Sequence, residues 1–240
     1  MKMYTNFASA LTAVAMVFGL VGNAYADVSL LTPADETQLA NWLGKATIKL
    51  TNIYSKAAGD TAVDFHRAVD GKGATFSVME ATNASGRTWL IGGYNPQSWA
   101  SAGEYNMTYD NAQRTSFLFN LTSSEIHRQT PKGYVYDSVG AYQAYNNASV
   151  GPTFGLGRDL YVPYNLTSGG VSLLYSYIDP DTGNFYKSIL DGSTYSQPDV
   201  TFGAIQVFQI GAVPEPSTYL MLALGLGLVA GLRLTRRTRA

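Results

Sequence analysis

Hydrophobic residues are distributed along this chain in two different ways. Near each end they form one uninterrupted run, over residues 8–21 and 219–232. Between these runs they occur in short stretches that alternate with polar residues, which is the pattern of strands with one buried face. The pattern predicts a β-rich domain in the middle of the chain and different roles for the two ends.

Two segments at the start of the domain have helical spacing instead. Thr32 and Pro33 are residues that favour the start of a helix, and Gly44 favours its end. A second short helix is predicted over 61–69, where apolar residues share one face.

The remaining pattern predicts strands and two hairpins. One hairpin joins 75–81 to 87–94 through a loop containing glycine, and the other joins 171–178 to 184–190 through Asp-Pro-Asp-Thr-Gly. Further strands are predicted over 45–54, 116–121, 159–162 and 203–210 and around Tyr134 and Tyr136. Two helices followed by antiparallel strands predict an α+β fold, a two-layer antiparallel β-sandwich with two short flanking helices.

The first apolar run has the features of a secretory signal peptide. Lys2 precedes the run, and Ala24 and Ala26 form a small-x-small cleavage site after it. We therefore expect a signal peptide over 1–26 and a mature chain that begins with Asp27.

The second apolar run belongs to a three-part tail over 213–240. A stiff segment with two prolines comes first, the apolar run follows, and a cluster of arginines closes the chain. The run is short for a transmembrane helix, which needs about 20 residues, and the arginines favour the cytoplasmic side. We expect transient anchoring in the membrane by this helix. The motif residues are Pro214, Glu215 and Pro216, and the basic residues are Arg233, Arg236, Arg237 and Arg239.

This tail resembles the PEP-CTERM sorting signal in all three parts. The resemblance implies recognition by an exosortase, a Gram-negative host and an extracellular polysaccharide. Together with the signal peptide, it predicts an exported protein of the cell envelope or the extracellular space.

The composition of the domain between the two ends excludes several functions. Residues 27–212 contain 11 basic and 16 acidic side chains, a net charge of −5, which disfavours nucleic acid as a partner. The chain has no cysteine, so disulfides, thiol nucleophiles and thiolate metal sites are excluded. The length is that of one domain.

Six segments in register over residues 30–210 resemble the TLDc domain, a module of eukaryotic oxidation-resistance proteins. They read LTPADETQLANWLG, DFHRAVDGKGATFSVME, LIGGYNPQSW, SFLFNL, GPTFGLGRDLYV and VTFGAIQVFQI. The positions that match the family motifs are Phe65, His66, Gly71, Gly73, Gly92, Gly93, Trp99, Gly151, Phe154, Gly155, Gly157 and Asp159.

The resemblance implies a β-sandwich and, in eukaryotes, protection against oxidative stress or binding to the vacuolar proton pump. Val69 stands where the family has a cysteine, so a thiol-based role is excluded. An exported domain cannot meet a cytosolic partner, and only the fold is therefore carried over.

Candidate catalytic residues are few. His66 lies four residues before Asp70 on one helical face, where it could be a base oriented by a carboxylate or a structural hydrogen-bonding group, and the second is favoured. Asp159 could bind a ligand, but bracing the glycine loop is favoured, and Glu80 is the third residue to test. His127 is expected to be exposed.

Recognised motifs for cofactors and metals are missing. The sequence lacks the Gly-x-Ser-x-Gly motif of the serine hydrolases' nucleophile elbow. A strand rather than a helix is predicted after Gly155-Leu156-Gly157, which argues against a phosphate-binding loop. The turn that begins at Asp179 lacks the glutamate that a calcium loop needs, since Leu190 holds that position. We expect neither a cofactor nor a metal.

Tyrosines are the remaining feature of the domain. Exposed aromatic rings beside Asn and Asp are suited to binding carbohydrate rings, but tyrosine is also common in half-buried strands. The leading hypothesis is a non-enzymatic envelope or matrix protein that binds polysaccharide or surface proteins. The alternatives are an extracellular enzyme acting on glycan or peroxide, and a stress-protective domain. The tyrosines considered are Tyr94, Tyr105, Tyr109, Tyr134, Tyr136, Tyr142, Tyr145, Tyr161, Tyr164, Tyr175 and Tyr177.

Deleting residues 213–240 tests the role of the tail. The deletion removes the proline motif, the apolar run and the arginines together, so we expect the domain to be secreted freely into the medium. Immunoblotting of the envelope and medium fractions measures this. Unchanged retention in the envelope would contradict the prediction.

Overall fold

A computed structural model describes residues 28–134, 136–156, 158–194 and 199–211 of the chain. The predicted signal peptide with its cleavage site, the sorting motif, the apolar tail helix, the terminal arginines and Gly157 lie outside the described residues. Within these ranges, no helix is long and apolar enough to cross a membrane.

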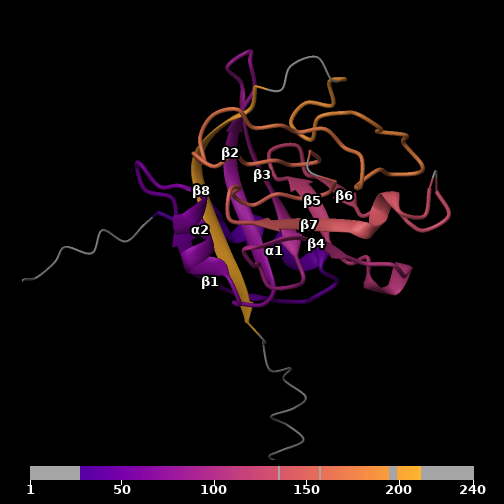
Figure 1. The fold of residues 1–240 in the computed structure, drawn as a ribbon, viewed down its shortest axis with the longest axis horizontal. Helices are drawn as coiled ribbons and strands as arrows, with labels where there is room; N and C mark the ends of the chain where they lie inside the picture. Colours follow the sequence, from indigo (N-terminus) through magenta and orange to yellow (C-terminus); the bar gives the residue numbers. More distant parts are fainter. Residues whose placement is uncertain (1–27, 135, 157, 195–198, 212–240) are drawn as a thin grey trace, which may run out of the picture.

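Two antiparallel sheets carry the fold (Figure 1). The larger sheet has six strands in the order β1-β8-β2-β3-β5-β6, and the smaller pairs β4 with β7. The bounds of the larger sheet are β1 Lys49–Ser55, β2 Thr75–Thr82, β3 Thr88–Asn95, β5 Phe117–Asn120, β6 Glu125–Arg128 and β8 Thr201–Gly211. The smaller sheet comprises β4 Ala102–Met107 and β7 Tyr142–Asn147, and two short 3₁₀ helices are η1 Asn111–Gln113 and η2 Val139–Ala141.

Both predicted helices are present, and local side chains define their ends. Helix α1 (Pro33–Trp42) begins with a capping box, in which Thr32 and Asp35 bond each other's main-chain N–H groups. Gly44 follows the helix with a φ of +69°, a conformation that glycine adopts without strain. Helix α2 (Ala62–Val69) has four buried residues among its eight.

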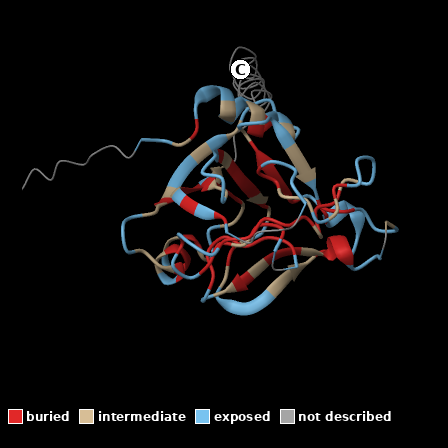
Figure 2. Cartoon of the chain, turned by 90° about the horizontal axis from the view of Figure 1, so that it is seen from above, coloured by how far each residue is buried: buried red, intermediate tan, exposed pale blue. Residues whose placement is uncertain are grey.

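The six-stranded sheet is covered on both faces, so its inner strands β2, β3 and β5 are mostly buried (Figure 2). On β2, Phe76 and Val78 belong to the core that includes Leu39 of α1. Met79 and Ala81 belong to the larger core on the other face, which includes α2 and the loop layer. The alternation of side chains along a strand assigns them to opposite faces.

Gly92 and Gly93 of β3 let one phenylalanine approach each face of the sheet closely. A Cβ on Gly92 would lie 2.5 Å from the ring of Phe119 and would overlap the carbonyl oxygen of Ser77. A Cβ on Gly93 would lie 2.5 Å from the ring of Phe154. The absence of side chains at these two glycines therefore permits a close approach on both faces of the strand.

The fold is α+β and mostly antiparallel, as the sequence predicts, and the first hairpin and the closing strand are confirmed. The second layer differs from the prediction, because outside the β4–β7 pair it is irregular chain with isolated bridges. The described residues around Tyr134 and Tyr136 form no strand, and 159–162 makes only such bridges. Strands β4, β6 and β7 were not predicted from the sequence.

The predicted hairpin over 171–190 is wrong for an identifiable reason. The main-chain N–H groups of Tyr175, Ser176 and Tyr177 donate to the carboxylate of Asp159 rather than to a neighbouring strand. The predicted turn does form, since Gly183 donates its N–H to the carbonyl oxygen of Asp179 at 2.9 Å.

Gly92→Ala tests the close contact at the sheet. The added methyl group requires the main chain at Ser77 or the ring of Phe119 to move, and overpacking of this kind costs about 1–3 kcal/mol. We expect a lower free energy of unfolding in urea. Gly211→Ala is the matched control, because its Cβ would have only ordinary contacts from 3.6 Å. Equal stabilities of the two variants would contradict the prediction.

Candidate functional site

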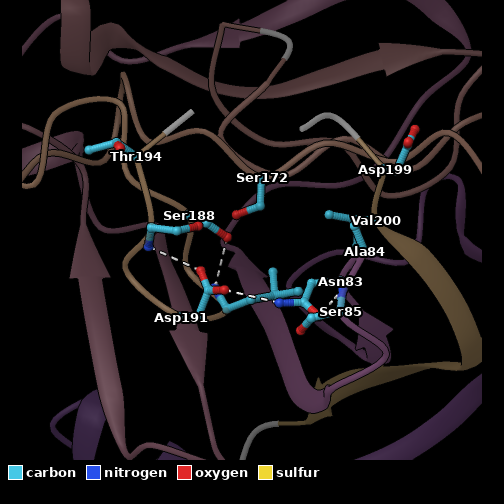
Figure 3. Close-up of a pocket in the computed structure, with 11 residues that line it drawn as sticks. Asn83, Ala84, Ser85, Ser172, Ser188, Asp191, Thr194, Asp199 and Val200 are labelled. Atoms are coloured by element: carbon cyan, nitrogen blue, oxygen red, sulfur yellow. Dashed lines mark hydrogen bonds between the residues drawn. The ribbon is translucent and has the colours of Figure 1, made fainter. Parts of the chain in front are cut away.

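A polar pocket lies at the end of the larger sheet where β2 turns into β3 (Figure 3). Its volume is about 210 Å³. The hairpin loop contributes one wall, and the irregular chain between β7 and β8 contributes the rest. The lining residues are Asn83, Ala84, Ser85, Ser172, Ser188, Leu190, Asp191, Ser193, Thr194, Asp199 and Val200.

Asn83 joins the two walls of the pocket. Its Oδ1 accepts the main-chain N–H groups of Ser85 and Arg87 at 3.0 and 3.2 Å, which shapes the hairpin loop. Its Nδ2 donates to Oδ2 of Asp191 at 3.0 Å, although 108 residues separate the two in sequence.

Asp191 is kept in its charged form. Partial burial acts to raise its pKa, but hydrogen bonds from Ser193 and Asn83 and the positive charge of Arg87 outweigh this effect and lower it. Oδ1 accepts the main-chain N–H of Ser193 at 3.0 Å. The pocket therefore presents a fixed negative charge near its rim.

Two serine hydroxyls in the pocket wall have protons available for a ligand. Oγ of Ser172 accepts the N–H of Ile189 at 2.9 Å, and Oγ of Ser188 accepts that of Leu190 at 3.2 Å. Within the described part of the chain, neither hydroxyl donates to a protein acceptor. A hydroxyl that already accepts can still donate one hydrogen bond.

The lining therefore combines hydroxyl, amide and carboxylate groups with three apolar side chains, and it contains no Lys, Arg or His among the described residues. This set matches the alternating donors and acceptors of a polyhydroxylated molecule. Anionic groups such as phosphate are disfavoured, since Asp191 and Asp199 both face the pocket region.

The three catalytic candidates from the sequence lie in different places. His66 is buried on α2, and Asp70 Oδ1 lies 2.7 Å from its Nδ1, as the helical spacing predicts. Nε2 lies 2.9 and 3.1 Å from the carbonyl oxygens of Asn147 and Val150. Both ring nitrogens are thus engaged, which favours the structural interpretation of His66.

Glu80 is exposed on β2 and lies on the opposite face of the sheet from Met79 and the α2 core. Its Oε2 accepts the N–H of Ala204 at 3.2 Å, next to Gly203 in β8. The structure therefore does not bring Glu80 and His66 into one site.

Asp159 is fully buried and organises the loop layer. Oδ1 accepts three consecutive main-chain N–H groups at 2.7–2.9 Å, and Oδ2 lies against Gly155 with no hydrogen-bond partner among the described residues. Burial raises the pKa of Asp159 to about 7, and the three hydrogen bonds oppose this rise. Asp159 therefore has a structural place, as expected, but its hydrogen bonds hold residues 175–177, whereas it only packs against Gly155 of the glycine loop.

Comparison with known families decides the identity of the domain. Residues 26–213 match the family model described as TLDc domain. This chain belongs to the TLDc family. Residues 212–237 match the PEP-CTERM protein-sorting motif, which marks an exported protein sorted by an exosortase. No curated protein matches the chain significantly.

The motif positions of this TLDc domain mostly form its core. Phe65, Trp99 and Phe154 are fully or almost fully buried and pack edge to face, with ring centroids 5.5 and 5.3 Å apart. Trp99 Nε1 also donates to Oγ1 of Thr75 at 2.9 Å. Gly151 lies against Leu166 and Val162, and Gly71, Gly73 and Gly155 have positive φ. These positions explain the fold and do not line the pocket.

Among the described residues, the tyrosines also do not line the pocket. Tyr177 is a core residue whose hydroxyl donates to the carbonyl oxygen of Gln143 at 2.6 Å. Tyr105, Tyr142 and Tyr145 form a half-exposed aromatic cluster on the smaller sheet, where the rings of Tyr105 and Tyr145 stack at 4.5 Å.

The pocket residues were missed because Asn83 and Asp191 resemble ordinary turn residues in the sequence.

The expectation for His127 is wrong. Its ring is half-buried, Nδ1 lies 2.9 Å from Nδ2 of Asn184, and burial lowers its pKa despite the nearby charges of Glu125 and Asp179. Among the described residues, no three His, Asp or Glu side chains gather where they could hold a metal ion.

Asp159→Asn tests the buried carboxyl group. Because folding raises the pKa of Asp159 from 3.8 to about 7, the folded wild type holds a proton that the unfolded chain releases between these values. Its stability therefore falls as pH rises from 4 to 7, by about 1.4 kcal/mol per pH unit at most. The asparagine variant retains an acceptor and has no such proton.

We expect the free energy of unfolding of Asp159→Asn, measured in urea from pH 4 to 8, to fall less steeply than that of the wild type. Asp181→Asn, at an exposed turn, is the control and should keep the wild-type slope. Parallel curves for the wild type and Asp159→Asn would contradict the assignment.

Proposed function

We propose that this protein is a non-enzymatic component of the cell envelope or extracellular matrix that binds a neutral polysaccharide. The observation that carries the proposal is the pocket at the β2–β3 hairpin, with its hydroxyl, amide and carboxylate lining. Sugars offer closely spaced hydroxyl groups that act as both donors and acceptors, so such a lining can pair with them in several directions.

Export and sorting support this assignment. The PEP-CTERM motif marks the chain as exported, and the cell envelope or the space outside it is where polysaccharides are met. An intracellular ligand would be inconsistent with that destination.

The state of Asp191 favours binding over hydrolysis of a glycan. Most glycoside hydrolases pair two carboxyl groups, one of which has a raised pKa and donates a proton to the leaving group. The pKa of Asp191 is lowered instead, and its oxygens already accept hydrogen bonds from Asn83 and Ser193. This carboxylate is suited to accept a hydrogen bond from a sugar hydroxyl.

The pocket variant Asp191→Ala/Asp199→Ala tests the proposal. We expect its affinity for extracellular polysaccharide from the source organism to fall about tenfold or more, because a hydrogen bond to a charged group contributes about 1.5–3 kcal/mol. Co-sedimentation of the purified protein measures binding. Asp181→Ala, which removes an exposed carboxylate elsewhere, should bind as the wild type does.

A neutral glucan and an acidic alginate complete the experiment. The acidic pocket predicts retention of the neutral polymer and weak binding of the acidic one. If the pocket variant binds as tightly as the wild type, the pocket is not the glycan site. If neither polymer nor the native polysaccharide binds, a surface protein becomes the partner to seek.

A further inference from the structure

The end of the domain where the sorting tail begins is basic, although the domain as a whole is acidic. Strand β8 starts beside the β2–β3 hairpin, where Thr201 pairs with Thr82, and ends at Gly211, which pairs with Lys49 (Figure 1). Its eleven residues span about 33 Å. The pocket and the start of the tail are thus at opposite ends of the larger sheet.

Four cations gather at the tail end of the sheet. Lys45 follows α1, and Lys49 begins β1 with its side chain along Gly211. The main-chain carbonyl of Lys72 accepts a hydrogen bond from the side-chain amide of Gln209 in β8 at 2.6 Å. The fourth, Arg128 at the end of β6, donates to the carbonyl of Trp42 at 2.9 Å.

None of these cations forms an ion pair within the described part of the chain, and Asp70, the acid nearest to Lys72 in sequence, is engaged by His66 and Ser101. The three lysines are exposed, and their ammonium groups have no partner among the described residues. The segments that form this end contain no Asp or Glu in sequence, and they are 41–50, 71–76, 94–101, 126–130 and 207–211. In a domain of net charge −5, this end is a separate basic surface, named here the tail-end surface.

The tail keeps this surface close to any membrane that holds the apolar run. Residues 212–218 are all that separates Gly211 from Tyr219, where the run starts. Seven residues reach at most about 23 Å when fully extended. The surface nearest to the membrane is therefore the one that carries Lys45, Lys49 and Lys72.

We propose that the tail-end surface docks on anionic lipid headgroups beside the membrane-held tail. Docking turns the pocket at the other end of the sheet away from the bilayer and brings the Pro-Glu-Pro motif to the membrane surface, where a membrane-embedded processing enzyme can reach it. The inference rests on export and on the tail, and it is independent of what the pocket binds. Juxtamembrane lysines are attracted to anionic lipids over about one Debye length, roughly 8–10 Å, and the short connection lets the surface come within this range.

The absence of cysteine from the chain makes the orientation measurable. Thr47→Cys places one label between the basic residues, and Ala84→Cys places one at the hairpin, where both positions are exposed. The full chain is reconstituted through its tail into phosphatidylcholine vesicles with or without phosphatidylglycerol. Quenching of each label by a headgroup-attached quencher reports its distance from the surface.

We expect strong quenching at position 47 with anionic lipid, loss of it in high salt or in neutral vesicles, and weak quenching at position 84 throughout. Lys45→Gln/Lys49→Gln/Lys72→Gln should shift the ratio of docked to undocked domain roughly a hundredfold. The control Arg67→Gln/Arg87→Gln/Lys187→Gln removes the same charge elsewhere and should dock as the wild type does.

Quenching that is equal in the two kinds of vesicle, or unchanged by the lysine substitutions, would overturn the proposal. So would binding of soluble acidic polysaccharide at these lysines without a response to lipid, which would assign the surface to a glycan. Co-sedimentation of the lysine variant with neutral glycan keeps the two proposals apart, because the pocket should bind normally in that variant.

Discussion

The contact of one phenylalanine with each face of β3 is the constraint on which the rest of this structure depends. Gly92 and Gly93 are adjacent, so their missing side chains lie on opposite faces, and Phe119 and Phe154 occupy the space. Phe119 joins the core beneath α1, whereas Phe154 joins the core beneath α2 and the loop layer. A six-stranded sheet with apolar residues on both faces needs a covering layer on each face. This pair of contacts places both covering layers against the same strand.

The loop layer is held by side chains that bond main-chain groups rather than by strand pairing. Asp159 binds three successive N–H groups, and Arg114 donates to three carbonyl groups around η2. Lys56 likewise donates to main-chain oxygens of Leu166, Phe202 and Gly203. Buried main-chain groups must be paired in some way, and charged side chains achieve this without a regular ladder. The irregular chain is consequently free to shape a pocket, which a flat sheet surface would not provide.

The two ends of the larger sheet differ in the charged groups that they carry. The pocket lies where β2 turns into β3. Apart from the amide of Asn83, the polar side chains that line it carry only carboxylate or hydroxyl groups. The opposite end carries the lysines and the start of the tail. This separation along β8 suits a protein that is held at one end and binds at the other, because neither contact obstructs the other.

The sequence by itself determined the family, the sorting motif, both helices, the first hairpin and the closing strand. All of these depend on local order, such as capping by Thr32, the alternation around the hairpin, or a short motif such as Pro-Glu-Pro. Tertiary structure alone decided where the pocket forms and that 171–190 is not a regular hairpin. The contacts involved, such as that of Asn83 with Asp191, join residues 108 positions apart. Alternation predicted strands there, but the main-chain N–H groups of 175–177 donate to the buried carboxyl group of Asp159 instead. Local patterns record which residues prefer burial, and they contain no information on which distant group will satisfy a main-chain N–H.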